Sequence, residues 1–77
     1  MTNGWTIKVT VPGQPIRLYV AAESDPKVAL ILANKALGTS PPRDRLETVG
    51  PIPGRLLDQI GVKAGEIKDV TDNPPNL

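Results

Sequence analysis

The sequence contains no cysteine, no histidine and no phenylalanine, and tryptophan and tyrosine occur once each. Without cysteine, the chain has no disulfide, no thiolate nucleophile and no cysteine zinc site. Without histidine, it also lacks the commonest general base of enzymes. The apolar fraction of 39% is therefore carried mainly by Val, Ile, Leu and Ala, and we expect an aliphatic core.

Neither sign of charge dominates, because nine basic side chains face eight acidic ones, for a net charge of +1. Binding to a phosphate backbone needs a concentrated positive field, so we expect no nucleic-acid partner. No apolar run approaches the roughly 20 residues of a membrane span, and the N-terminus lacks the features of a signal peptide. We therefore expect a cytoplasmic protein with no membrane partner, and 77 residues allow one domain.

The remaining polar residues form no catalytic, metal-binding or phosphate-binding motif. Ser24 and Ser40 stand at a predicted helix start and beside prolines, where serine serves as a cap or turn residue. The acidic residues are scattered singly, apart from Glu23 and Asp25, and no glycine-rich phosphate loop occurs. We therefore predict that the chain is not an enzyme and has no catalytic residue, no cofactor and no bound metal.

The first half of the chain has the pattern of a β-hairpin followed by a helix. Apolar and polar residues alternate over residues 6–11 and 16–20, and Pro-Gly lies in the connector between them. Asp25 suits the N-cap of a helix, Pro26 its first position, and Gly38 the left-handed conformation that ends it.

The second half is predicted to contain a weaker strand over residues 43–50, a turn at 51–54, a single helical turn and a last strand at 67–70. The helical turn carries Leu56, Leu57 and Ile60. Residues 71–77 have two prolines and almost nothing to bury, so we predict a flexible tail after a domain over residues 1–70.

This order of elements, together with several local sequences, resembles ubiquitin. Residues 16–50 align with ubiquitin without a gap, through the alternating strand, the capped helix, the two following prolines and Arg45-Leu46 before Gly50. The segment GRLLDQIGVKAGEIKDV is similar to the L-x-x-x-G-V phrasing of ubiquitin-like domains. The resemblance implies an α+β, ubiquitin-like β-grasp fold, in which a mixed sheet of four to five strands packs on one α-helix.

Within that family, the chain looks most like the bacterial ubiquitin-like modifiers of conjugation operons that act in antiviral defence against phage. This likeness implies a modifier that E1-like and E2-like enzymes attach to target proteins through its tail, with trimming by a processing peptidase. The alternative is a non-conjugated β-grasp module that acts through protein interaction or oligomerisation, and a stand-alone domain with another purpose stays open.

Two positions depart from the ubiquitin pattern. Glu47 stands where ubiquitin has its main apolar recognition residue, and no Gly-Gly closes the sequence. A receptor built for an apolar contact could not bury the Glu47 charge cheaply, so we do not expect ubiquitin's standard receptors to bind.

Two candidate sites lie in the tail and on the sheet. The conjugation and processing tail consists of Thr71, Asp72, Asn73, Pro74, Pro75, Asn76 and Leu77. Strand alternation predicts a partner-binding sheet face formed by Lys8, Arg17, Tyr19, Arg45 and Glu47. The core positions that alternate with them are Ile7, Val9, Ile16, Leu18, Val20 and Leu46.

A third candidate lies on the helix, which is apolar over more of its circumference than one sheet can cover. We predict that the side formed by Ala29, Leu30, Ala33 and Leu37 faces the sheet. That roll leaves outward a surface for self-association, giving a homo-oligomer, or for docking a partner, formed by Val28, Ile31, Leu32 and Lys35. In the alternative roll, Val28 and Leu32 are buried instead.

Overall fold

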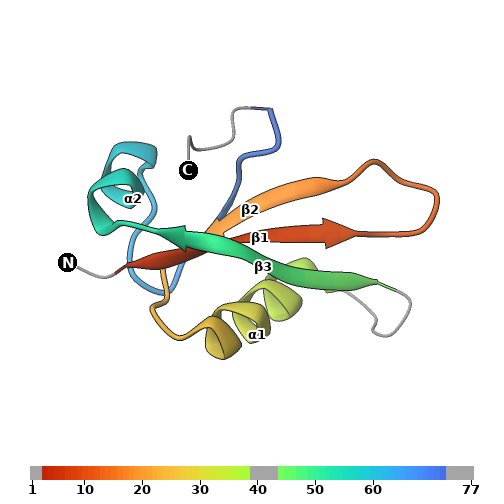
Figure 1. Cartoon of the computed structure of the whole chain (residues 1–77), viewed down its shortest axis with the longest axis horizontal. Helices are drawn as coiled ribbons and strands as arrows, with labels where there is room; N and C mark the ends of the chain where they lie inside the picture. Colours follow the sequence, from red (N-terminus) through yellow and green to blue (C-terminus); the bar gives the residue numbers. More distant parts are fainter. Residues whose placement is uncertain (1–2, 39–43, 73–77) are drawn as a thin grey trace.

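The computed structural model describes residues 3–38 and 44–72. Its elements are β1 (Gly4–Thr10), β2 (Arg17–Ala21), α1 (Pro26–Leu37), β3 (Arg45–Ile52), α2 (Gly54–Ile60) and β4 (Ile67–Asp69). The chain is a small α+β domain with a four-stranded sheet and two helices, in the predicted order of elements (Figure 1).

The strands of the sheet lie in the order β3-β1-β2-β4, and each of the three neighbouring pairs of described strands is antiparallel. The prediction of a mixed sheet is therefore wrong for these strands. β1 and β2 form the predicted hairpin, and α1 carries the chain from β2 to β3 on the far side of β1. As a result β2 and β3 run in the same direction with β1 between them.

Helix α1 begins and ends where its capping residues predict. The Asp25 carboxylate accepts a hydrogen bond of 2.9 Å from the Lys27 amide, and Pro26 occupies the first position, where no N–H is needed. Gly38 has φ 63° and ψ 34°, and its amide donates to the Asn34 carbonyl at 2.9 Å. A left-handed residue is most easily glycine, so the predicted helix boundaries are confirmed.

The two helices cover opposite faces of the sheet. Ala21 of β2 packs in a cluster with Ala29 and Ala33 of α1, whereas Val20, its neighbour in the strand, packs with Leu57 of α2. Successive side chains of a strand point to opposite faces. Figure 1 shows α1 below the sheet and α2 above one end of it. The sheet was predicted to pack on one helix, whereas the shorter helix α2 also packs on its other face.

The register of the β1–β2 hairpin decides which side chains share a face. Ile7 lies opposite Tyr19, and Lys8 lies opposite Leu18. Directly opposed residues point to the same face, so Tyr19 points toward α1 with Ile7, while Leu18 and Val20 point away from α1. The prediction that Ile7, Leu18 and Val20 share one core face is therefore wrong. Tyr19, predicted to be a surface residue, is half-buried against the core beneath α1.

Strand β3 ends two residues later than predicted, because it continues through Pro51 to Ile52, where the sequence predicts a turn. Proline is tolerated there because β3 is the outermost strand on its side of the described sheet, with no ladder bond to donate outward. The strand also contains a bulge: Thr6 lies opposite Gly50 but Ile7 lies opposite Thr48. The extra residue between them, Val49, is 55% exposed.

The start of β1 lies very close to β2 and α2, which makes Gly4 necessary. A Cβ atom at Gly4 would collide with the carbonyl oxygen of Ala21 and lie 3.0 Å from Cδ1 of Leu57. The neighbouring Asn3 side chain accepts a hydrogen bond of 3.1 Å from the Gly54 amide at the start of α2. The strand and the short helix are therefore joined both by packing and by a hydrogen bond.

We expect Gly4→Ala to destabilise the domain by at least about 1–3 kcal/mol, because the added methyl group must push backbone atoms apart. Urea unfolding followed by circular dichroism measures this loss. Val49→Ala in the same sheet serves as the control, since its exposed side chain should change the free energy of unfolding by no more than about 0.5 kcal/mol. Equal losses in the two variants would contradict the close approach.

Candidate interaction surfaces

The described part of the chain offers surfaces and not a chemical centre. Within it, no three Asp or Glu side chains are grouped so that they could hold a metal ion. None of the helices there is long and apolar enough to cross a membrane. The candidate sites are therefore judged by exposure, charge and hydrogen bonding.

The five residues predicted to form one sheet face are divided between two faces. Lys8 lies opposite Glu47, and Arg45 lies on the same side two residues earlier in β3, so these three point away from α1. Arg17 and Tyr19 oppose core residues of β1 and point to the α1 side. The predicted sheet-face site is therefore not assembled as one surface.

Arg17 and Tyr19 instead line a hollow of about 310 Å³ near the end of the hairpin, together with Leu37 and Asp44. Asp44 is only 6% exposed and is not among the site residues that the sequence predicts. Its single signal in the sequence is its place directly before a strand, which does not distinguish it from an ordinary turn residue.

One side of α1 is largely uncovered, and we call the four residues predicted to lie there the outer stripe: Val28, Ile31, Leu32 and Lys35. Ile31 is 63% exposed and Val28 is 43% exposed, whereas Ala29 and Ala33 are fully buried against the sheet. The favoured roll of the helix is therefore confirmed. Leu32 is the exception, because it is half-buried and packs against the core cluster beneath α1.

The outer stripe is positively charged. Lys35 belongs to it, Lys27 stands one turn before Ile31, and both lysines are exposed. The helix sequence PKVALILANKAL contains no acidic residue, and neither lysine forms an ion pair within the described residues. The stripe is thus apolar in the middle and cationic at both ends.

In the described part of the chain two other large aliphatic side chains are exposed, but they are isolated. Ile16, predicted to be in the core, is 50% exposed just before β2, and Val49 lies in the bulge of β3. Strand β1 separates β2 from β3, so the two side chains do not adjoin. Single exposed aliphatic residues are normal, whereas a pair on one helix face is a candidate contact surface.

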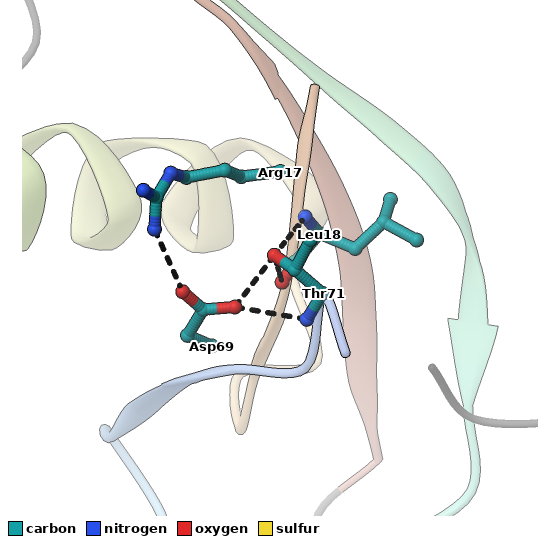
Figure 2. A network of polar contacts seen from close by, with 4 residues as sticks. All are labelled: Arg17, Leu18, Asp69 and Thr71. Carbon is teal, nitrogen blue, oxygen red and sulfur yellow. Dashed lines mark hydrogen bonds and ion pairs between the residues drawn. The ribbon is translucent and has the colours of Figure 1, made fainter. Parts of the chain in front are cut away.

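A polar network fixes the chain where it leaves the sheet (Figure 2). The Thr71 hydroxyl donates to the Asp69 carboxylate at 2.6 Å and accepts from the Leu18 amide at 3.0 Å. The Thr71 amide donates to the same carboxylate oxygen at 2.8 Å. Arg17 approaches the other oxygen of Asp69 at 3.3 Å. Thr71 therefore continues, with its side chain, the hydrogen bonding of β4 to β2.

Hydrogen bonds from the side chain and the amide of Thr71 lower the pKa of Asp69 below its ordinary value, and the charge of Arg17 adds to this. Asp69 therefore remains a carboxylate, and an acceptor of these bonds, throughout the neutral and mildly acidic range. The sequence signal was an Asp two residues before a Thr, a spacing that favours such local turns.

The sequence predicts a tail that begins at Thr71, whereas Thr71 is half-buried and hydrogen-bonded to the sheet. Asp72 is exposed, and residues 73–77 of the predicted tail lie outside the described residues. A hollow of about 600 Å³ adjoins this point, lined by Gln59, Ile60, Lys68, Asp69, Val70 and Asp72. The network thus sets the position from which the following residues start.

Comparison of the chain with protein-family models, with curated proteins and with solved structures gives no match.

Thr71→Val keeps the shape of the side chain but leaves the Leu18 amide and the Asp69 carboxylate without the hydroxyl. We expect it to lower the free energy of unfolding by about 0.5–1.5 kcal/mol and to speed hydrogen exchange at the Leu18 amide. Thr71→Ser is the matched control, since it keeps the hydroxyl and should behave like the wild type. Loss of protection in Thr71→Ser but not in Thr71→Val would show that the methyl group, and not the hydroxyl, holds this segment.

Proposed function

We propose that this chain is a non-enzymatic protein-interaction domain whose contact surface is the outer stripe of α1. The observation that supports this is the pair Val28 and Ile31, both exposed on a helix that is capped at each end and packed against the sheet. A rigid helix loses little conformational freedom when it binds, so most of the free energy gained by covering these side chains is kept.

The size of the apolar pair limits what it can do alone. Full burial of an aliphatic side chain is worth about 1.5–3 kcal/mol, and these two are already partly covered in the free domain. Covering both yields on the order of 3 kcal/mol, which is less than the roughly 8 kcal/mol of a micromolar complex. The partner must therefore also engage polar or charged groups around the pair.

A ubiquitin-like β-grasp identity remains our proposal for the fold family. The order of the elements and the two caps of α1 support it. The antiparallel order β3-β1-β2-β4 departs from the mixed sheet that the resemblance implies. The proposed interaction function does not depend on this identity.

A second candidate function is that of a ubiquitin-like modifier, conjugated through the residues that follow Asp72. The observation that favours it is the network of Asp69, Thr71 and Leu18, which holds the base of this segment in a fixed place. A modifier needs such a fixed starting point for its C-terminal segment, because the activating enzyme must bind the folded domain and the reacting carboxylate at a set separation.

The first proposal predicts that a photoreactive amino acid at Val28 crosslinks to a small set of proteins in cells. The additional substitution Ile31→Glu should remove these crosslinks. Because Ile31 is exposed, the substitution should change the free energy of unfolding by no more than about 0.5 kcal/mol. The same photoreactive residue at Gln59, which is exposed on α2, is the control. Crosslinks at Val28 that survive Ile31→Glu would contradict the proposal.

The second proposal predicts that an E1-like enzyme encoded beside this gene converts the chain to an acyl adenylate with ATP, releasing pyrophosphate. A cysteine of the enzyme then displaces AMP from the adenylate to form a thioester. Mass spectrometry should find a covalent adduct that dithiothreitol cleaves and that identifies the reacting carboxylate. The reaction without ATP is the control. Absence of the adduct with a neighbouring enzyme that is active on its own substrates would count against conjugation.

A further inference from the structure

We propose that the outer stripe binds an acidic helix of a different protein and not a second copy of this chain. The partner helix would present an apolar side chain between two carboxylates. This inference rests on the proposed interaction function, and it names the chemistry of the partner.

The charges of α1 set the spacing of those carboxylates. Lys27, Ile31 and Lys35 occupy positions i, i+4 and i+8, which fall along one side of a helix. At 1.5 Å of rise per residue, the Cα atoms of the two lysines stand about 12 Å apart along the helix. Ile31, midway between them, is the most exposed large aliphatic side chain of the described residues. A complementary helix therefore carries Glu or Asp about two turns apart, with Leu, Ile or Met between.

The same charges oppose pairing of the stripe with a second copy. In an antiparallel pair centred on Ile31, Lys27 of each copy meets Lys35 of the other, and in a parallel pair each lysine meets its equivalent. Either arrangement brings four ammonium groups together with no acidic residue from α1 between them. Like charges placed opposite one another disfavour a complex, so the lysines oppose dimerisation through the outer stripe.

The acidic residues nearest in sequence do not alter this. Asp25 accepts from the Lys27 amide, and Glu23 accepts from the Asp25 amide at 3.2 Å. Both carboxylates are thereby held at the start of the helix, before the stripe begins. They leave Lys35, near the other end of the helix, as a cation with no carboxylate partner in the described residues.

The test uses two synthetic alanine-based helical peptides with leucines on one face. One carries glutamate one turn before and one turn after the leucines, and the other carries lysine at the same positions. Each is titrated into the isotopically labelled full chain, and amide chemical shifts report the binding site and the dissociation constant. The charge-reversed variant is Lys27→Glu/Lys35→Glu, and the control with the same change in net charge is Arg55→Glu/Lys63→Glu, placed at and just after α2.

We expect the wild type and the control variant to bind the glutamate peptide at α1 about tenfold more tightly than the lysine peptide, and the charge-reversed variant to show the opposite preference. Two exposed charge pairs that change from attraction to repulsion are worth about one factor of ten. Ile31→Glu should abolish binding of the glutamate peptide.

The other outcomes separate the two proposals. Binding of both peptides with equal affinity, lost in Ile31→Glu, would keep the stripe as a contact surface but overturn the acidic partner. Absence of any shift in α1 with either peptide would overturn the contact surface itself. Dimerisation of the wild type in light scattering, abolished by Ile31→Glu, would overturn the inference in favour of a second copy. Binding only to vesicles of anionic phospholipid would overturn it in favour of a membrane surface.

Discussion

The register between β1 and β2 determines what the rest of this domain can bury. Ile7 pairs with Tyr19 and Lys8 with Leu18, and a shift by one residue would exchange the two faces of β2. In the observed register, β2 supplies Ala21 to the cluster under α1 and Val20 to the cluster under α2. Both faces of one five-residue strand are therefore used, and β2 becomes the common wall of two small cores. The close approach at Gly4 holds this arrangement, because a side chain there would separate β1 from β2 and from α2 together.

The edges of the sheet are less suited to binding than α1 is. β3 is the outer strand on one side, and it carries Pro51, which has no N–H to offer, and a bulge at Val49. Proline, bulges and charged side chains are the usual devices that keep an edge strand from pairing with another chain. β4, the outer strand on the other side, has only three residues, two of which are Lys68 and Asp69. With both described edges protected in this way, α1 is the element of the described chain on which two large aliphatic side chains, Val28 and Ile31, are exposed together.

Helix α1 could be predicted because its signals are local. Asp25, Pro26 and Gly38 act on the backbone within one turn, so the sequence alone places both ends of α1.

The faces of β2 could not be predicted, because alternation states which residues share a side of one strand but not how two strands are offset. The connector of the hairpin determines that offset, and a different pairing reverses every face of β2. The sheet-face site was predicted from the wrong offset, and so it is divided in the structure. The outer stripe lies on one helix, and the outward positions of its residues were predicted correctly apart from Leu32. The packing of Leu32 depends on distant residues of the core.

The way α1 distributes its side chains argues for function more than for stability. Its fully buried positions are Ala29 and Ala33, which bring little apolar area to the core, while the larger Val28 and Ile31 face outward. Folding alone would favour the reverse, since buried apolar area is what stabilises a domain this small. An outward aliphatic pair does not stabilise the core, and it carries a risk of aggregation. Such a pair is useful to the protein where a partner covers it. Val70, near the end of the described chain, packs on the other side, in the cluster on the face away from α1, and Figure 1 shows the segment that follows β4 rising from the sheet while α1 lies beneath it. Docking through α1 would therefore use a side of the domain other than the one on which Val70 packs.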